Sequence, residues 1–206
     1  MAKLKAPLFS FGASGKIADS LVFFKWKGLN VVRQYVVPAN PDTEAQSTHR
    51  AYLTAAVAAI HAAQILAAQP LGALDSSAYA LLGSLQKTPR TWFNTAVKVW
   101  IDQYVADLHG AIYHGCEVVS QDTQVSCDFQ LTDEGANAVT EGNFWYGTKK
   151  TTLINSEAGV DQGAGRWTAV ITGLTNGKIY YVQFKPTAHA DYVGANSGIY
   201  HGTPHA

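Results

Sequence analysis

A glycine-rich run near the N terminus is the first stretch whose residue types could bind a phosphate. It reads Gly-Ala-Ser-Gly-Lys over residues 12–16. A phosphate loop has a glycine, four further residues and then Gly-Lys-Ser/Thr, so that backbone amides and the lysine surround the phosphate. Here Ser10 stands at the first glycine position and Ile17 at the hydroxyl position. The residues that follow are β-branched and aromatic, which favours a strand over the required helix. We therefore predict no nucleotide site and no cofactor.

Seven histidines raise the question of a metal site. His109 and His114 are five residues apart across Gly110. That is not the i, i+4 spacing that places two imidazoles on one helix face. His201 and His205 lie in the C-terminal tail, where solvated side chains are usual. We predict no intrinsic metal site.

The acidic residues do not form a recognisable catalytic pair. Asp133, Glu134, Glu141 and Asp161 fall in expected turns, where carboxylates are commonly solvated. The sequence also lacks the Gly-x-Ser-x-Gly pattern of a nucleophile elbow. We therefore predict no catalytic residue and expect that the protein is not an enzyme.

Two cysteines, Cys116 and Cys127, are too few for a disulfide framework or a zinc site. A two-residue turn at Gln121 and Asp122 would place them opposite each other on a hairpin. A cross-strand disulfide fits that geometry. Two separate, buried thiols fit a protein made in the cytoplasm better, and this second interpretation is favoured.

The composition is apolar and weakly charged. Apolar residues make up 47% and charged residues 15%, against about 25% charged in an average soluble protein. The net charge is zero, yet residues 1–50 hold seven basic and three acidic residues, while residues 115–206 hold five and nine. This segregation favours head-to-tail contacts between copies, although charged termini also serve solubility.

No segment is predicted to enter a membrane. The longest mostly apolar run, Leu53–Ala68, is interrupted by polar residues and shorter than the roughly 20 residues of a membrane span. The first twelve residues are too short and too broken for a signal peptide. We expect synthesis in the cytoplasm without a membrane anchor.

Residues 1–40 are predicted to form an extended arm and a β-hairpin. A turn at Lys27 and Gly28 would pair Trp26 with Leu29 and make both faces of the ribbon largely apolar. A lone two-stranded ribbon is marginal in water. Helices of the same chain or a neighbouring subunit must therefore cover it. The predicted interface residues are Phe23, Phe24, Trp26, Val31, Val32 and Tyr35.

Residues 41–110 are predicted to be helical. The capping-box pair Thr43 and Gln46 indicates a helix over Glu44–Ala68. A shorter helix is expected near Asp75–Leu85. Thr88-Pro89 then resembles an N-cap followed by proline at the first helical position. Aromatic residues recur at helical spacing in the third helix, which predicts a core face.

Residues 111–206 are predicted to form an all-β sandwich. Five alternating segments are separated by turn residues: QVSCDFQL, NFWYGTK, RWTAVITGL, KIYYVQFKP and SGIYHGT. Leu174, an Asn-Gly turn and Tyr180 resemble the tyrosine corner of fibronectin type III domains. The tryptophan usual in the second strand of that family is absent, and Phe129 is nearest to its place. A generic immunoglobulin-like sandwich therefore stays open. The predicted class is α+β.

The opening of the chain resembles a family of uncharacterised proteins encoded by bacteriophages and prophages. The motifs that carry the resemblance are the Gly/Ser-rich start, the WKG hairpin, VVR and NPDTEAQ, followed later by TPRTWFNTAVKVW. The resemblance covers roughly residues 9–105 and implies a structural role in the virion. We predict a decoration or minor head protein, or a tail-associated one. It would assemble in many copies with itself or with other virion proteins.

A carbohydrate-binding or host-surface adhesion module is the alternative. Aromatic side chains of the sandwich could stack on host-surface glycans, although alternating strand aromatics more often belong to a core. The residues proposed for glycan contact are Trp145, Tyr146, Trp167, Tyr192 and Tyr200.

Nucleic acid is not an expected partner. The arm is basic and carries Phe24 and Trp26, which could stack on bases. Its lysines, however, alternate with apolar positions in a ribbon that needs burial. An affinity for DNA that falls steeply with salt would reverse this expectation.

Overall fold

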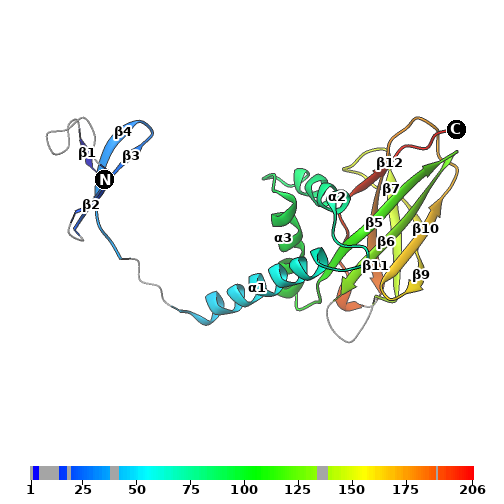
Figure 1. Ribbon diagram of the computed structural model, residues 1–206, viewed down its shortest axis with the longest axis horizontal. Helices are drawn as coiled ribbons and strands as arrows, with labels where there is room; N and C mark the ends of the chain where they lie inside the picture. The colour runs from blue at the N-terminus through cyan, green and yellow to red at the C-terminus, as the bar shows by residue number, and fades with distance from the viewer. Residues whose placement is uncertain (1, 5–13, 18–19, 38–41, 134–138, 189) are drawn as a thin grey trace. The chain divides into compact units, whose positions relative to one another are not determined.

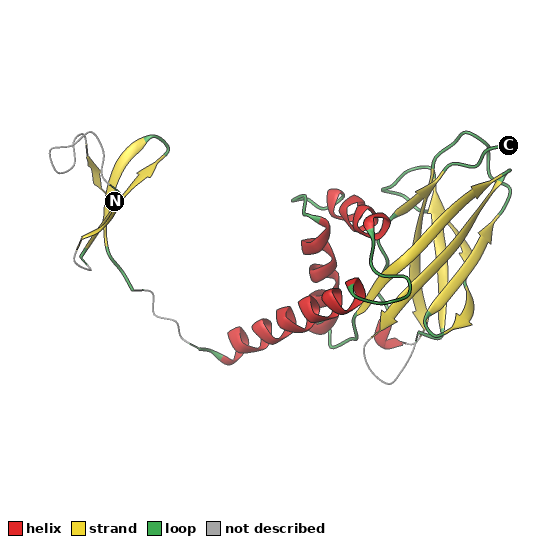
Figure 2. Cartoon of the chain, in the orientation of Figure 1, coloured by secondary structure: helices red, strands yellow, loops and turns green. Residues whose placement is uncertain are grey.

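The computed structural model describes residues 2–4, 14–17, 20–37, 42–133, 139–188 and 190–206. The chain divides into two compact units, Met1–Glu44 and Ala45–Ala206. Helices and antiparallel sheets are both present, and two of the sheets form a strand-rich sandwich (Figures 1 and 2). The predicted α+β class is confirmed.

The first unit is a four-stranded antiparallel sheet in the order β1-β4-β3-β2. Its strands are β1 (Ala2–Leu4), β2 (Gly15–Ile17), β3 (Leu21–Trp26) and β4 (Leu29–Gln34). β3 and β4 form the predicted hairpin with the predicted register, Trp26 opposite Leu29. Lys27 and Gly28 have φ values of 47° and 80°, as a type I′ turn requires. The sequence does not predict β1 and β2, because three residues are too few to show an alternation.

Three helices begin the second unit: α1 (Glu44–Gln64), α2 (Ala73–Ser84) and α3 (Trp92–Val105). α1 ends before the predicted Ala68. The helix could not continue past Gln69 in any case. Gln69 has a φ of 50° and precedes Pro70, whose ring disfavours a helical conformation in the residue before it.

The N-cap predicted for α3 is wrong. Thr91, not Thr88, caps the helix, and its hydroxyl accepts a hydrogen bond from the backbone N–H of Asn94 at 3.3 Å. Both threonines can act as caps. A start at Thr91 places Thr95 and Trp100 among the buried residues of the helix.

Two four-stranded antiparallel sheets follow, in the orders β5-β6-β10-β9 and β12-β11-β7-β8. The first contains β5 (Ala111–Gln121), β6 (Gln124–Asp133), β9 (Val160–Gly163) and β10 (Arg166–Ile171). The second contains β7 (Glu141–Gly147), β8 (Asn155–Ala158), β11 (Tyr180–Ala188) and β12 (Tyr200–Gly202), with the short 3-10 helix η2 (Ala190–Tyr192) after β11. This architecture is compatible with an immunoglobulin-like domain.

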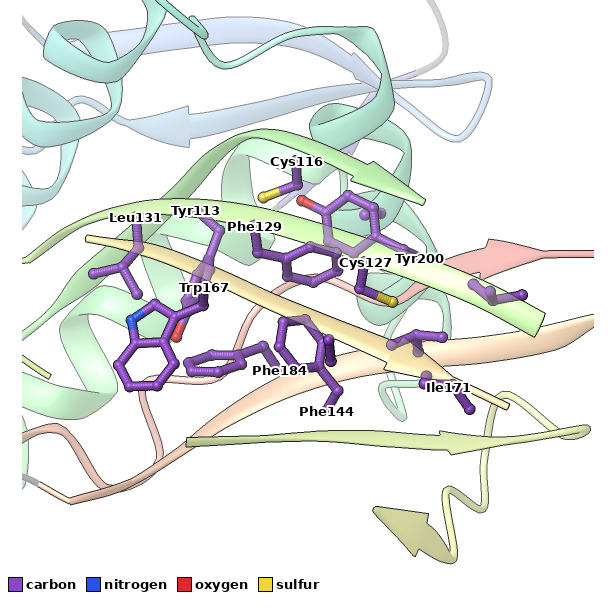
Figure 3. Close-up of a cluster of buried hydrophobic side chains, with 14 of the residues drawn as sticks. Tyr113, Cys116, Cys127, Phe129, Leu131, Phe144, Trp167, Ile171, Phe184 and Tyr200 are labelled. Carbon is purple, nitrogen blue, oxygen red and sulfur yellow. The ribbon is translucent and has the colours of Figure 1, made fainter. Parts of the chain in front are cut away.

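Aromatic side chains of both sheets meet in the core of the sandwich (Figure 3). Phe184 lies at the centre, with its ring centroid 5.0 Å from that of Phe144 and 5.2 Å from that of Trp167. Phe129 reaches Phe144 from the opposite sheet at 5.1 Å. Edge-to-face and tilted contacts at these separations add to the stabilisation from apolar burial.

β5 joins the helices to the sandwich. Ile112 belongs to the hydrophobic cluster of the helices, with Ile60 and Trp100, whereas Tyr113 belongs to the cluster of the sandwich. Alternate residues of one strand thus enter two cores. The sequence predicts separate parts at 41–110 and 111–206, and the contacts of the structure group them in one unit.

Candidate functional site

The N-terminal sheet has two chemically different faces, which follow from the strand register. Residues directly opposite each other in antiparallel strands point to the same face. The apolar face carries Ile17, Leu21, Phe23 and Val32, and the polar residues Lys25, Asn30 and Gln34 lie on the same side. The aromatic face is made by Lys16, Val22, Phe24, Trp26, Leu29, Val31, Arg33 and Tyr35.

Large apolar side chains remain exposed on both faces. Trp26 is 54% exposed and its cross-strand partner Leu29 is 47% exposed, at the tip of the hairpin. Ile17 and Leu21 are exposed on the apolar face. Covering the rest of Trp26 and Leu29 would remove on the order of 200 Å² of apolar surface, worth about 5 kcal/mol at about 25 cal/mol per Å².

The six predicted interface residues differ in how far they are exposed to solvent. Phe23 and Val31 are buried, with 8% and 5% of their surface exposed, so another molecule is not needed to cover them. This corrects the prediction that Phe23 and Val31 belong to an interface with another molecule. Phe24, Val32 and Tyr35 are half-buried, and Trp26 alone of the six is exposed.

Two cations lie over rings of the aromatic face. The Arg33 guanidinium is 5.5 Å from the centroid of the Phe24 ring, and the Lys16 ammonium is 4.5 Å from that of Tyr35. Both distances are in the range of cation–π attraction. The face therefore offers rings and positive charge side by side.

Asp75 fixes α2 to the sandwich of the second unit. Its Oδ2 accepts hydrogen bonds from the backbone N–H of Gly72 and of Gly115, both at 2.9 Å. Its Oδ1 accepts from the backbone N–H of Cys116 at 3.1 Å and from the Tyr200 hydroxyl at 2.8 Å. Four donors, from the N-cap of α2, from β5 and from β12, thus compensate one buried carboxylate. This arrangement is structural, because it occupies the oxygens that acid–base chemistry would need.

Sequence reasoning did not identify Asp75. Its only local signal is its place three residues after Gly72, where a carboxylate can accept a hydrogen bond from the first residue of a helix. The contacts with Gly115, Cys116 and Tyr200 join residues 40 or more positions apart. No spacing pattern in the sequence predicts these long-range contacts.

The two cysteines are free and buried. The β5–β6 turn falls at Asp122 and Thr123, one residue later than the hairpin considered above, and Cys127 lies opposite Val118. A register shift between His114 and Glu117 moves Cys116 out of line as well. Burial raises the pKa of the Cys127 thiol to about 12, and burial, then the nearby Asp75 carboxylate, raise the pKa of Cys116 well above its usual value. Both thiols are therefore protonated at neutral pH and poor nucleophiles.

A hollow of about 350 Å³ lies between α2 and strands β5 and β12. Leu74, Leu81, Val118 and Ile199 contribute much of its apolar lining. The Tyr200 hydroxyl at its wall already donates to Asp75. Ser77, Tyr181 and His201 also line the hollow.

The structure corrects three of the five residues proposed for glycan contact. Trp167, Tyr192 and Tyr200 are buried in the sandwich core, so their rings cannot face a sugar (Figure 3 labels Trp167 and Tyr200). Tyr146 is half-buried and packs against the same core. Trp145 is half-buried too, with the Lys185 ammonium 5.0 Å from the centroid of its ring.

His109, which precedes β5, and His114, which lies in β5, contact different residues. Both ring nitrogens of the buried His114 are in hydrogen bonds, with the Gln69 carbonyl at 2.8 Å and the Thr132 hydroxyl at 2.9 Å. His109 lies 4.0 Å from the Asp191 carboxylate. Among the described residues, no group of three potential ligands gathers to hold a metal ion.

Comparison with known proteins gives no assignment. No protein-family model, curated protein or solved structure matches the chain. In the part of the chain that the structure describes, no helix has the length and hydropathy to span a membrane.

Proposed function

We propose that the protein is a structural component of a bacteriophage virion that assembles in multiple copies and attaches through its N-terminal sheet. A decoration or minor head protein is the first form of this proposal, and a tail-associated protein is the second. The resemblance of residues 9–105 to proteins encoded by phages and prophages is one support. The other support is the exposure of Trp26 and other large apolar side chains on the small N-terminal sheet.

The observation that carries the proposal is the exposure of large apolar side chains on a very small sheet. Trp26 and Leu29 are paired at the hairpin tip, and Ile17 and Leu21 lie on the opposite face. Contiguous exposed apolar groups on a small folded element often mark an interaction surface. Repetition of one such contact over a particle would multiply a modest affinity per copy.

The second unit would then be the displayed body, with a fibronectin type III-like sandwich. The tyrosine corner supports this finer identification, because the Tyr180 hydroxyl accepts a hydrogen bond from the backbone N–H of Thr175 at 3.1 Å. In that family a tyrosine at the same corner bonds to backbone a few residues upstream.

The test is incorporation into particles of the phage that encodes the protein. Deletion of residues 1–37 should abolish incorporation, measured as copies per major capsid protein by quantitative mass spectrometry of purified particles. The double variant Trp26→Ser/Leu21→Ser should lower it, whereas Ile154→Ser, at an exposed residue of the second unit, should not. Wild-type occupancy of the deletion variant would rule out the sheet as the attachment site.

Adhesion to a glycan stays as the second candidate because of Trp145. Its ring lies on the outer side of β7, and neighbouring Asn143 and Lys185 are directly paired across β7 and β11. An aromatic ring with an amide and an ammonium beside it can bind a sugar. Saturable binding on a glycan array, lost in Trp145→Ala but kept in Tyr181→Ala, would favour adhesion over a purely structural role.

A further inference from the structure

The hollow between α2 and strands β5 and β12 has the size and the lining of a small-molecule site. Its volume of about 350 Å³ falls within the roughly 300–1,000 Å³ of ligand pockets. Leu81 from α2, Val118 from β5 and Ile199 just before β12 bring apolar side chains to it from three segments of the chain. Figure 1 shows α2 beside β12. A space of this volume has room for one small molecule, whereas a helix about 10 Å across is too large for it.

Hydrogen bonds between α2 and the sandwich hold the walls of the hollow in place. The Ile199 backbone N–H donates to the Ala78 carbonyl at 3.1 Å. The Asp75 carboxylate accepts from the backbone N–H of Cys116 and from the Tyr200 hydroxyl, so it joins α2 to both strands. These five residues are buried. The hollow is therefore formed before a ligand enters, which lowers the entropic cost of binding.

Three polar side chains also line the hollow, from α2, β11 and β12. Tyr181 and His201 lie directly opposite each other across β11 and β12, with ring centroids 6.4 Å apart. Within the described residues, neither the Tyr181 hydroxyl nor the His201 ring takes part in a hydrogen bond. The Ser77 hydroxyl donates to the Ala73 carbonyl at 2.8 Å, and its oxygen can still accept. The hollow thus offers donors and acceptors to a polar group of a ligand.

The charges around the hollow favour an uncharged ligand. Among the described residues, no Asp, Glu, Lys or Arg side chain lines it. The Asp75 carboxylate lies behind the Tyr200 hydroxyl, where four donors already occupy its oxygens. An anion would find no cation here and would be repelled by Asp75, and a cation would find no accessible carboxylate. Burial of an unpaired charge is costly, so either ion would bind weakly.

From this combination we infer that the hollow binds one uncharged, mainly apolar small molecule that carries a hydrogen-bonding group. The apolar body would cover Leu81, Val118 and Ile199, and the polar group would bond to Tyr181 or His201. The inference concerns a site in the second unit and does not depend on the proposed virion role, which uses the N-terminal sheet.

The test is a fluorescence titration of the full chain with two matched probes at pH 8, where histidine side chains are ordinarily uncharged. N-Phenyl-1-naphthylamine is uncharged, apolar and carries one N–H group. 1-Anilinonaphthalene-8-sulfonate has the same ring systems and an added sulfonate. The uncharged probe should bind saturably, one molecule per chain. The sulfonate should bind at least about 10-fold more weakly, because its charge would lose water without gaining a cation.

Substitutions locate the bound probe. Leu81→Trp adds volume inside the hollow and should weaken binding of the uncharged probe more than about 10-fold. Tyr181→Phe should weaken it about 2- to 10-fold, as expected for the loss of one hydrogen bond. The control Trp26→Ser removes the exposed ring of the other unit and should leave the affinity unchanged. Circular dichroism and elution volume of each variant should match the wild type.

Methyl NMR of the unmodified chain gives a readout that needs no variant. The uncharged probe should shift the methyl signals of Leu81, Val118 and Ile199, but not those of Ile17 and Leu21 in the N-terminal sheet.

The inference would be overturned by absence of saturable binding, by equal affinity for the two probes, or by methyl shifts confined to residues outside the hollow. Loss of binding in Trp26→Ser with normal binding in Leu81→Trp would also overturn it, since the probe would then occupy the hairpin tip. If wild type binds neither probe but Leu81→Trp fails to enter particles, the hollow receives a side chain of another virion protein instead of a small molecule.

Discussion

The two units of this protein treat their aromatic residues in opposite ways. In the sandwich, Trp167 is 2% exposed and packs against Phe184. In the N-terminal sheet, Trp26 is more than half exposed, on an element too small to enclose it. Burial on folding increases with chain length, so the larger unit can enclose an aromatic ring such as that of Trp167 more completely than the smaller unit can. The second unit therefore encloses the aromatic rings of its sandwich core, whereas the first leaves Trp26 exposed at the hairpin tip.

Removal of a core ring should show the largest effect. Phe184→Ala should lower the free energy of unfolding of the second unit by about 3–5 kcal/mol, because it leaves a cavity beside Phe144 and Trp167. Trp26→Ala should change it by less than about 0.5 kcal/mol, as is usual for surface substitutions. Urea unfolding followed by near-ultraviolet circular dichroism measures both. Similar losses in the two variants would break the contrast between the units.

Loss of the Asp75 carboxylate should rank second. Asp75→Asn places an amide N–H₂ group among four donors, and we expect about 3 kcal/mol of destabilisation in the same assay. Asp102→Asn is the matched control, since the Asp102 carboxylate is exposed and pairs with Lys98 along α3; it should cost about 0.5 kcal/mol or less. If the helices and the sandwich of the wild type unfolded in two separate transitions, the description of residues 45–206 as one unit joined by Asp75 would be contradicted.

The buried thiols should make stability fall at alkaline pH. The unfolded chain releases the Cys127 proton near pH 9, whereas burial raises the pKa of the folded thiol to about 12. The contribution of this thiol is therefore fully present below pH 9 and is lost as pH rises toward 12, by about 1.4 kcal/mol per pH unit. Cys127→Ala should make the slope of unfolding free energy between pH 9.5 and 10.5 shallower by about that amount. An unchanged slope would show that the folded thiol ionises normally.

The tyrosine corner should give the smallest of these effects. Tyr180→Phe removes the acceptor of the Thr175 N–H and should cost about 1 kcal/mol. Tyr181→Phe, at the half-buried next position, should be nearly neutral. If both variants behave alike, the hydroxyl of Tyr180 does not stabilise the corner.

Periodic segments could be predicted from the sequence, and contacts between distant segments could not. The hairpin register follows from alternating apolar residues and a Lys-Gly turn, so Trp26 and Leu29 were paired correctly. β8 and β9 are exposed along their whole length and carry no apolar alternation. The first half of β5 is buried on both sides, between helices and sandwich, so it does not alternate either.

The candidate site was predicted only in part for a related reason. The alternation of side chains along a strand predicts that Trp145 and Tyr146 point to opposite faces, but it does not predict which of the two faces is buried. Trp167, Tyr192 and Tyr200 were therefore proposed as surface platforms although they form the core. The basic residues were counted in the sequence, whereas the pairing of β2 with β3 was needed to place Lys16 on the aromatic face.

Hydroxyl-radical footprinting of the free chain and of assembled particles tests the central claim most directly. In the free chain, Trp26 should be oxidised rapidly and Trp167 slowly, in keeping with their exposures. On assembly, Trp26 should become protected while Trp167 does not change. Equal oxidation of Trp26 in the free and assembled states would contradict the account, because the N-terminal sheet would then carry its exposed rings without covering them in the particle.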